Sequence, residues 1–168
     1  MTLTDREFWA LVHGMGLGAA FLLAYAGGLA GLWSLRPALL TPEGVVERTR
    51  RLVVGTWAMA VVAWATVITG TWIVYPWYRA EDGPRTDLLA NPDTSGWHTF
   101  GMEWKEHVAW IAPFLATAVA FVVTYYRKDL VRLTGLRRLL IVMFTLAFGI
   151  AGIAGLLGAL ITKAGPIR

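Results

Sequence analysis

Four long apolar stretches, separated by polar segments, dominate the pattern of hydrophobic and polar positions along the chain. They run over about residues 8–35, 52–78, 106–126 and 139–162. Each reaches the roughly 20 residues that a helix needs to cross the hydrocarbon core of a bilayer. Because lipid offers backbone N–H and C=O groups no hydrogen-bonding partner, such stretches must be helical. The pattern therefore predicts an all-α integral membrane protein, a four-helix bundle forming one domain over residues 1–168.

Basic residues gather in the two short connections, between the first two spans and between the last two. They are Arg36, Arg48, Arg50, Arg51, Arg127, Lys128, Arg132, Arg137 and Arg138. Loops rich in Lys and Arg stay in the cytoplasm. We therefore expect both termini and the long 79–105 connection on the outer side. Orientation in the membrane accounts for the basic charge of the chain, so no nucleic-acid partner is expected.

Composition and missing motifs narrow the class of protein further. Hydrophobic residues make up 57% of the chain and charged residues only 15%. The absence of cysteine excludes disulfides, thiolate metal sites, iron–sulfur clusters and covalent c-type haem. The chain has no P-loop, dinucleotide-binding glycine pattern or zinc-protease motif, and no charge deep in a span. We expect a multi-pass protein of a bacterial plasma membrane that is neither an autonomous enzyme nor an ion pump.

All three histidines lie toward the predicted outer side. His13 lies about one and a half turns into the first span, His107 opens the third, and His98 lies just before it. Two neutral imidazoles on separate helices at similar depth can supply both axial ligands of a haem b. Gly14 and Gly18, next to His13, leave room for a planar macrocycle. We therefore predict His13 and His107 as haem-iron ligands, with Gly14 and Gly18 in the binding surface.

Other readings of these residues stay open. His98 could replace His107 as the second ligand, hydrogen-bond a haem propionate, or face solvent. Gly14 and Gly18 also form a G-x-x-x-G pair, which brings helices close together in membranes without any cofactor. A histidine at a membrane interface can also have a purely structural role.

A metal site without haem competes for the same region. Glu103 and His107 are four residues apart, so a continuous helix places them on one face. Together with Glu106 and the other two histidines they could bind a metal ion, and Met15 and Met102 would suit copper. The alternative for the charged residues 103–106 is a solvated helix N-terminus, where acidic groups favour the helix dipole.

Two further features concern helix packing. The fourth span carries a glycine at every third position, namely Gly149, Gly152, Gly155 and Gly158. We expect this stripe to pack against helices inside the bundle, with a groove for a partner subunit as the alternative. Pro113 is expected to kink the third helix just after His107.

The four spans and the histidines on two helices resemble small four-helix membrane cytochromes b, the electron-transfer and quinone-linked subunits of respiratory complexes. The resemblance implies haem b as a cofactor, quinone as a second candidate ligand, and other subunits of a membrane complex as partners, besides lipid. Those families place histidines at both membrane faces to hold two haems. This chain has none on the predicted cytoplasmic side. We therefore expect at most one bis-histidine haem, near the outer face.

The expected function is that of an electron-transfer subunit between an extracytoplasmic donor and quinone or a partner subunit. Two functions of other classes remain as alternatives. The chain could be a cofactor-free accessory subunit of a membrane complex, with the Trp97–His107 segment as its docking surface. It could also be a membrane protein that handles copper or iron.

Overall fold

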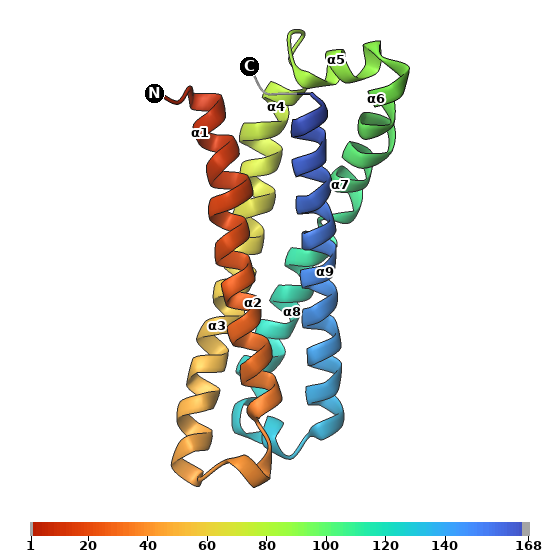
Figure 1. Cartoon of the computed structure of the whole chain (residues 1–168). Coiled ribbons are helices and arrows are strands. Elements are labelled where there is room, and N and C mark those ends of the chain that lie inside the picture. The colour runs from red at the N-terminus through yellow and green to blue at the C-terminus, as the bar shows by residue number, and fades with distance from the viewer. Residues whose placement is uncertain (1, 166–168) are drawn as a thin grey trace. The chain divides into compact units, whose positions relative to one another are not determined.

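Residues 2–165, which the computed structural model describes, form helices and connecting turns and contain no strand. Four continuous helical stretches are long and apolar enough to cross a membrane: Asp5–Ser34, Pro42–Tyr78, Pro92–Val131 and Thr134–Ala164 (Figure 1). The predicted all-α class and the four predicted apolar helices are therefore confirmed.

Several shorter elements follow one another within these stretches. In chain order they are α1 (Asp5–Leu11), η1 (Val12–Gly16), α2 (Leu17–Ser34), η2 (Pro37–Leu39), α3 (Pro42–Thr69), η3 (Gly70–Val74), α4 (Tyr75–Tyr78), α5 (Pro84–Ala90), α6 (Pro92–Gly96), η4 (Trp97–Met102), α7 (Glu103–Val108), α8 (Ile111–Tyr126), η5 (Arg127–Val131) and α9 (Thr134–Ala164). The segments η1, η3 and η4 are π-helical, whereas η2 and η5 are 3₁₀-helical.

The third helical stretch begins well before its apolar part. Hydropathy predicts a start near residue 106, but the helix already begins at Pro92. The Asn91 side chain accepts a hydrogen bond from the backbone N–H of Asp93, and proline in the first turn loses no helical hydrogen bond. The Trp97–His107 segment is therefore part of this helix.

The third helical stretch is locally irregular near Pro113, where a kink was predicted. The chain leaves α-helical geometry at residues 109–110, between α7 and α8. Proline has no N–H, so the carbonyl of Ala109, four residues earlier, loses its usual helical donor.

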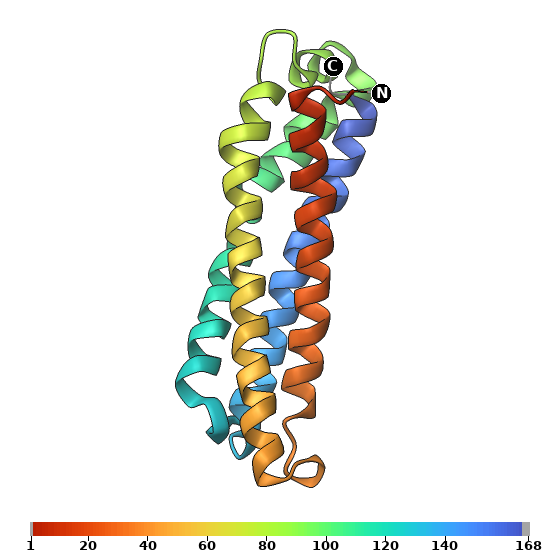
Figure 2. The ribbon, with the colours of Figure 1, turned by 90° about the vertical axis from the view of Figure 1, so that its left-hand side faces the viewer.

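The chain divides into two compact units, and each of the four long helices contributes residues to both. Unit 1 contains the chain up to Ala19, Trp64–Trp110 and the chain from Ile150 onward. Unit 2 contains Ala20–Ala63 and Ile111–Gly149. Within unit 1, α5 lies beside the end of α9, where Gly165 faces Leu88 and Pro84 (Figures 1 and 2).

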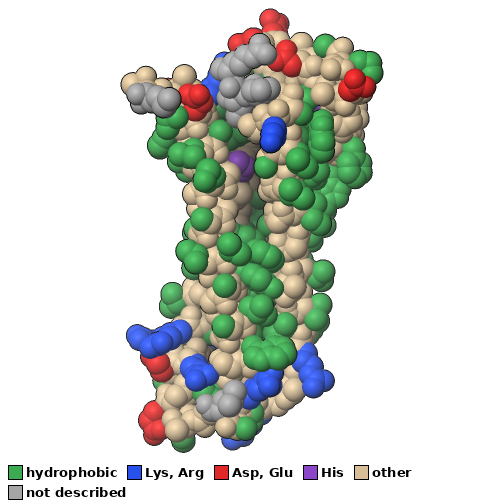
Figure 3. Space-filling model, in the orientation of Figure 1, with side chains coloured by type: hydrophobic (Ala, Val, Ile, Leu, Met, Phe, Trp, Pro, Cys, Tyr) green, Lys and Arg blue, Asp and Glu red, His purple; other side chains and the backbone are tan. Residues whose placement is uncertain are grey.

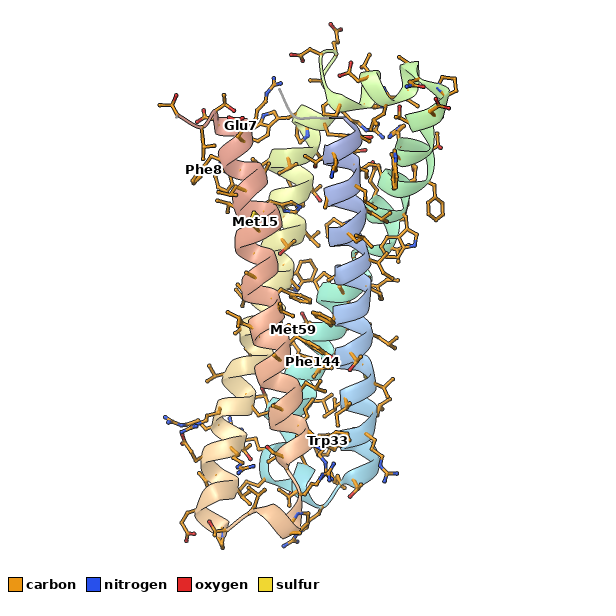
Figure 4. All side chains as sticks on the ribbon, in the orientation of Figure 1. Glu7, Phe8, Met15, Trp33, Met59 and Phe144 are labelled. Carbon is orange, nitrogen blue, oxygen red and sulfur yellow. The ribbon has the colours of Figure 1, made fainter. Side chains whose placement is uncertain are left out.

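Unit 2 has an apolar core in which glycines admit large side chains. Phe144 and Met59 are fully buried there (Figure 4). A Cβ added at Gly28 would lie 2.6 Å from the Phe144 ring, so only glycine fits beside this ring. Polar groups also join helices: the Trp57 indole N–H donates to the Thr124 hydroxyl at 2.9 Å. The basic side chains of this unit gather around its turns (Figure 3).

The glycine stripe of the fourth span does not pack as expected. A Cβ added at Gly149, Gly152 or Gly155 would meet no atom within 4 Å, so the predicted packing against helices is wrong for these three. Gly158 is different, because an added Cβ would lie 2.7 Å from the Nζ atom of Lys105. Small residues in a regular stripe therefore do not by themselves indicate a helix contact.

Candidate functional site

Unit 1 contains all three π-helical segments found in the described part of the chain, η1, η3 and η4. Such segments are rare inside α-helices and often occur at functional sites. His13 lies in η1, and His98 lies in η4. This distribution makes unit 1 the candidate functional region.

The His13 imidazole is held by the hydroxyl of Thr69, directly before η3. Its Nδ1 atom lies 3.0 Å from Thr69 Oγ1. Thr69 uses its own hydrogen to donate to the carbonyl oxygen of Ala65, 2.8 Å away. With the Thr69 hydrogen directed at Ala65, the Thr69 oxygen can accept from His13. This arrangement would place the imidazole proton on Nδ1 and leave the lone pair on Nε2.

Gly70 makes room for this imidazole. An added Cβ at Gly70 would lie 2.9 Å from Cε1 and 3.4 Å from Nε2 of His13. Any larger side chain at this position would therefore push the ring away from Thr69. Figure 3 shows one histidine set back between helices of unit 1. The sequence alone does not point to Thr69 or Gly70, because no local motif connects His13 with Thr69, 56 positions away.

His107 has the same protonation pattern as His13 in a different setting. Its Nδ1 atom lies 2.8 Å from the backbone carbonyl oxygen of Glu103, which can only accept, so Nδ1 donates. The Nε2 atom again keeps its lone pair. The side chain is 73% exposed, and the Glu103 carboxylate lies 3.8 Å from it. The predicted shared face of Glu103 and His107 is confirmed.

His98 is a buried residue, so the reading in which it faces solvent is wrong. It is only 7% exposed and lies in a cluster with Tyr78, whose hydroxyl is 2.9 Å from His98 Nδ1. The third helix begins early, at Pro92, so His98 belongs to a helix and not to a loop. Tyr78 itself is 5% exposed and packs with Met102 and Leu88.

Glu106 is paired with a guanidinium group. Its Oε2 atom lies 3.7 Å from an Arg79 nitrogen, and Arg79 in turn lies over the Tyr75 ring at 4.9 Å. The other carboxylate oxygen, Oε1, is buried without a hydrogen bond, as is Nε of Arg85. The contacts of Arg79 with Glu106 and with Tyr75 therefore connect helical segments of unit 1.

Lys105 does not fit the alternative in which residues 103–106 form a solvated helix N-terminus. It is largely buried and lies against Gly158 of α9. The dipole argument for residues 103–106 fails, because the helix begins at Pro92 and not at Glu103. A small cavity lies beside Lys105, with Arg6, Trp77 and Met102 among its other lining residues.

The predicted metal constellation does not form in the described residues 2–165. No three His, Asp or Glu side chains there are grouped so that they could hold a metal ion. Met15 is 70% exposed and Met102 only 8%, so the two thioethers have different surroundings. The histidines instead have separate partners: Thr69 for His13, Tyr78 for His98 and Glu103 for His107. No family model, curated protein or solved structure matches this chain.

Proposed function

We propose that this chain is an electron-transfer subunit of a bacterial plasma membrane, in which His13 and His107 bind one haem b. The observation that supports this function best is that Nδ1 of each ring lies within hydrogen-bonding distance of an oxygen, Thr69 Oγ1 for His13 and the Glu103 carbonyl for His107. With the proton on Nδ1, the Nε2 atom of each ring keeps its lone pair. Histidines that ligate metals commonly donate their second ring N–H to a carbonyl or carboxylate oxygen in this way.

The surroundings of His13 leave space for a planar group. A Cβ added at Gly14 or Gly18 would meet no atom within 4 Å, so this side of the first helix is open. Within residues 2–165, no atom approaches this pair, so its G-x-x-x-G spacing does not serve a helix contact inside the described chain. Thr69 fixes the orientation of the His13 ring, and the Glu103 carbonyl fixes that of His107. The two rings have different neighbours, and the feature they share is an oxygen atom within hydrogen-bonding distance of Nδ1.

A bound haem b would supply one-electron transfer, which no side chain of this cysteine-free chain offers as readily. The residues proposed to hold it are His13 and His107 through Nε2, with Gly14 and Gly18 beside His13. Quinone or a partner subunit is proposed to exchange electrons with this site. Other subunits of the complex are proposed to cover the exposed His107 side chain, which is 73% exposed in the isolated chain.

We propose that unit 1 faces the outer side of the membrane, with both termini. The support is the distribution of charge. The nine basic residues of the short connections belong to unit 2, and the connection within unit 1 carries Glu81, Asp82, Asp87 and Asp93. Connections rich in Lys and Arg stay in the cytoplasm. His13, His98 and His107 would then all lie near the outer surface.

Haem content of purified variants tests the function. The chain is produced in cells supplied with haem, and haem is quantified per polypeptide for the wild type, His13→Ala, His107→Ala and His98→Gln. We expect one haem in the wild type, none in the two alanine variants, and one in His98→Gln, because His98 binds Tyr78. Haem retained in His107→Ala but lost in His98→Gln would move the second ligand to His98. A wild type without haem would contradict the cytochrome function.

A cofactor-free accessory subunit is the second candidate function. It is favoured by the contacts that fix the Trp97–His107 segment to unit 1 through His98 and Glu106. The same segment carries an exposed aromatic side chain, Phe100, which is 68% exposed. In this case the purified protein is colourless, and Phe100→Ala reduces its recovery with a partner complex.

A further inference from the structure

The cavity of unit 1 contains a lysine that has no ion-pair partner among residues 2–165. The cavity volume is about 60 Å³, and its charged lining residues are Lys105, Arg6 and Asp82. Asp82 lies 3.8 Å from an Arg6 guanidinium nitrogen. Among residues 2–165, no carboxylate lies within ion-pair distance of the Lys105 ammonium. The lining therefore carries one more positive than negative charge.

An ammonium in this position is costly unless an anion accompanies it. Lys105 is largely buried within a helical stretch that is apolar enough to cross a membrane. Charged groups in such stretches almost always pair with an opposite charge or line a functional cavity. Lys105 lines a cavity, and the missing counter-charge indicates that a bound anion completes the site.

Gly158 fits the ammonium closely. A Cβ added at Gly158 would lie 2.7 Å from Lys105 Nζ and 3.7 Å from its Cε. The neighbouring stripe positions Gly152 and Gly155 face no atom within 4 Å. Of these three glycines, only Gly158 has a side chain against it. The Lys105 ammonium therefore lies directly against the backbone of α9.

We propose that this cavity binds the phosphate group of an anionic phospholipid, with Lys105 as the main phosphate contact. The rest of the lining is mainly apolar and includes Trp77, Met102 and Ile161, which suits a ligand that also has an apolar part. A phosphodiester carries one negative charge, which matches the excess charge of the lining. Basic pockets between membrane helices recognise lipid headgroups through this chemistry. Inorganic phosphate has the same anionic group as the phospholipid but lacks its acyl chains.

Native mass spectrometry of the whole chain tests the lipid site. The protein is delipidated in a neutral detergent and titrated with phosphatidylglycerol or with phosphatidylcholine. We expect the wild type to bind one phosphatidylglycerol in preference to phosphatidylcholine. Lys105→Met should weaken this binding about tenfold, the loss expected for one charge-assisted contact. The matched control is Lys163→Met, which removes an exposed lysine outside the cavity lining and should bind as the wild type does.

A second variant, Gly158→Ala, keeps Lys105 but displaces its ammonium group. Gly158→Ala should also weaken phosphatidylglycerol binding, because its Cβ displaces the ammonium, and alanine favours the helix. Gel filtration and circular dichroism check that each variant folds. If Lys105→Met does not fold, the binding measured for Gly158→Ala tests the lipid site.

Inorganic phosphate distinguishes the two sources of the anion. Lack of competition at millimolar concentration supports the lipid. Full competition would overturn it in favour of a free anion, and equal binding by the wild type and both variants would overturn the site itself.

Discussion

Three pairs of polar side chains join helical segments of unit 1. His13 meets Thr69, His98 meets Tyr78, and Glu106 meets Arg79. A buried polar group without a partner costs roughly 1–3 kcal/mol, more than a satisfied one contributes. These pairs therefore determine how the helices of unit 1 can approach one another, and through them the orientation of the rings proposed to bind haem.

Removing the acceptor of His13 tests this role directly. Thr69→Val keeps the shape of the side chain but removes the hydroxyl that lies against His13 Nδ1. We expect a loss of about 1 kcal/mol in the free energy of unfolding. Thermal unfolding of the purified protein in detergent measures it. Thr69→Ser keeps the hydroxyl and should unfold close to the wild type, whereas equal unfolding of the valine variant and the wild type would contradict the hydrogen bond.

Long-range pairs of this kind are the part of the site that sequence cannot predict. His13 and Thr69 are 56 positions apart, and nothing in either neighbourhood indicates the other. The burial of His98 could not be predicted for a related reason, because it depends on a helix start at Pro92 that lies outside the apolar stretch. The histidines themselves, and the shared face of Glu103 and His107, followed from residue type and helical spacing.

Helical elements were easier to predict than their contacts. Four apolar stretches predict four helices, and the missing N–H of Pro113 predicts the interruption between α7 and α8. Both follow from local rules. Contacts between helices depend instead on which side chain faces which, so the glycines of the fourth span gave a wrong prediction.

Two adjacent glycines in α2 offer a matched test of helix packing in unit 2. A Cβ at Gly28 would lie 2.6 Å from the Phe144 ring, whereas one at Gly27 would meet nothing within 4 Å. We expect Gly28→Ala to cost about 1–3 kcal/mol, the usual cost of overpacking a core. Gly27→Ala should be neutral or slightly stabilising, because alanine favours a helix. Unfolding curves that coincide for the two variants would disprove the packing of Gly28 against Phe144.

At the scale of the whole molecule, chemistry and charge separate along the chain. Unit 1 contains the three histidines, the three π-helical segments and the cavity beside Lys105. Unit 2 contains the basic connections and an apolar core around Phe144. In the orientation proposed above, unit 1 faces the outer side of the membrane.

Cysteine labelling tests this orientation cleanly, because the chain has no cysteine of its own. Glu43 and Glu81 are both exposed and lie in connections of opposite predicted sidedness. In intact bacterial cells, a membrane-impermeant maleimide should label Glu81→Cys and leave Glu43→Cys unlabelled until the cells are opened. The reverse pattern would place unit 1 in the cytoplasm and contradict the orientation.

The central claim is that unit 1 holds a redox-active haem b, and one spectrum tests it most directly. The purified wild-type protein, produced with full haem supply, is measured after reduction with dithionite and after oxidation. The account predicts a difference spectrum with a single sharp α band of the b type, as two imidazole ligands produce. A flat difference spectrum would contradict it, and unit 1 would then be a docking or lipid-binding region without electron transfer.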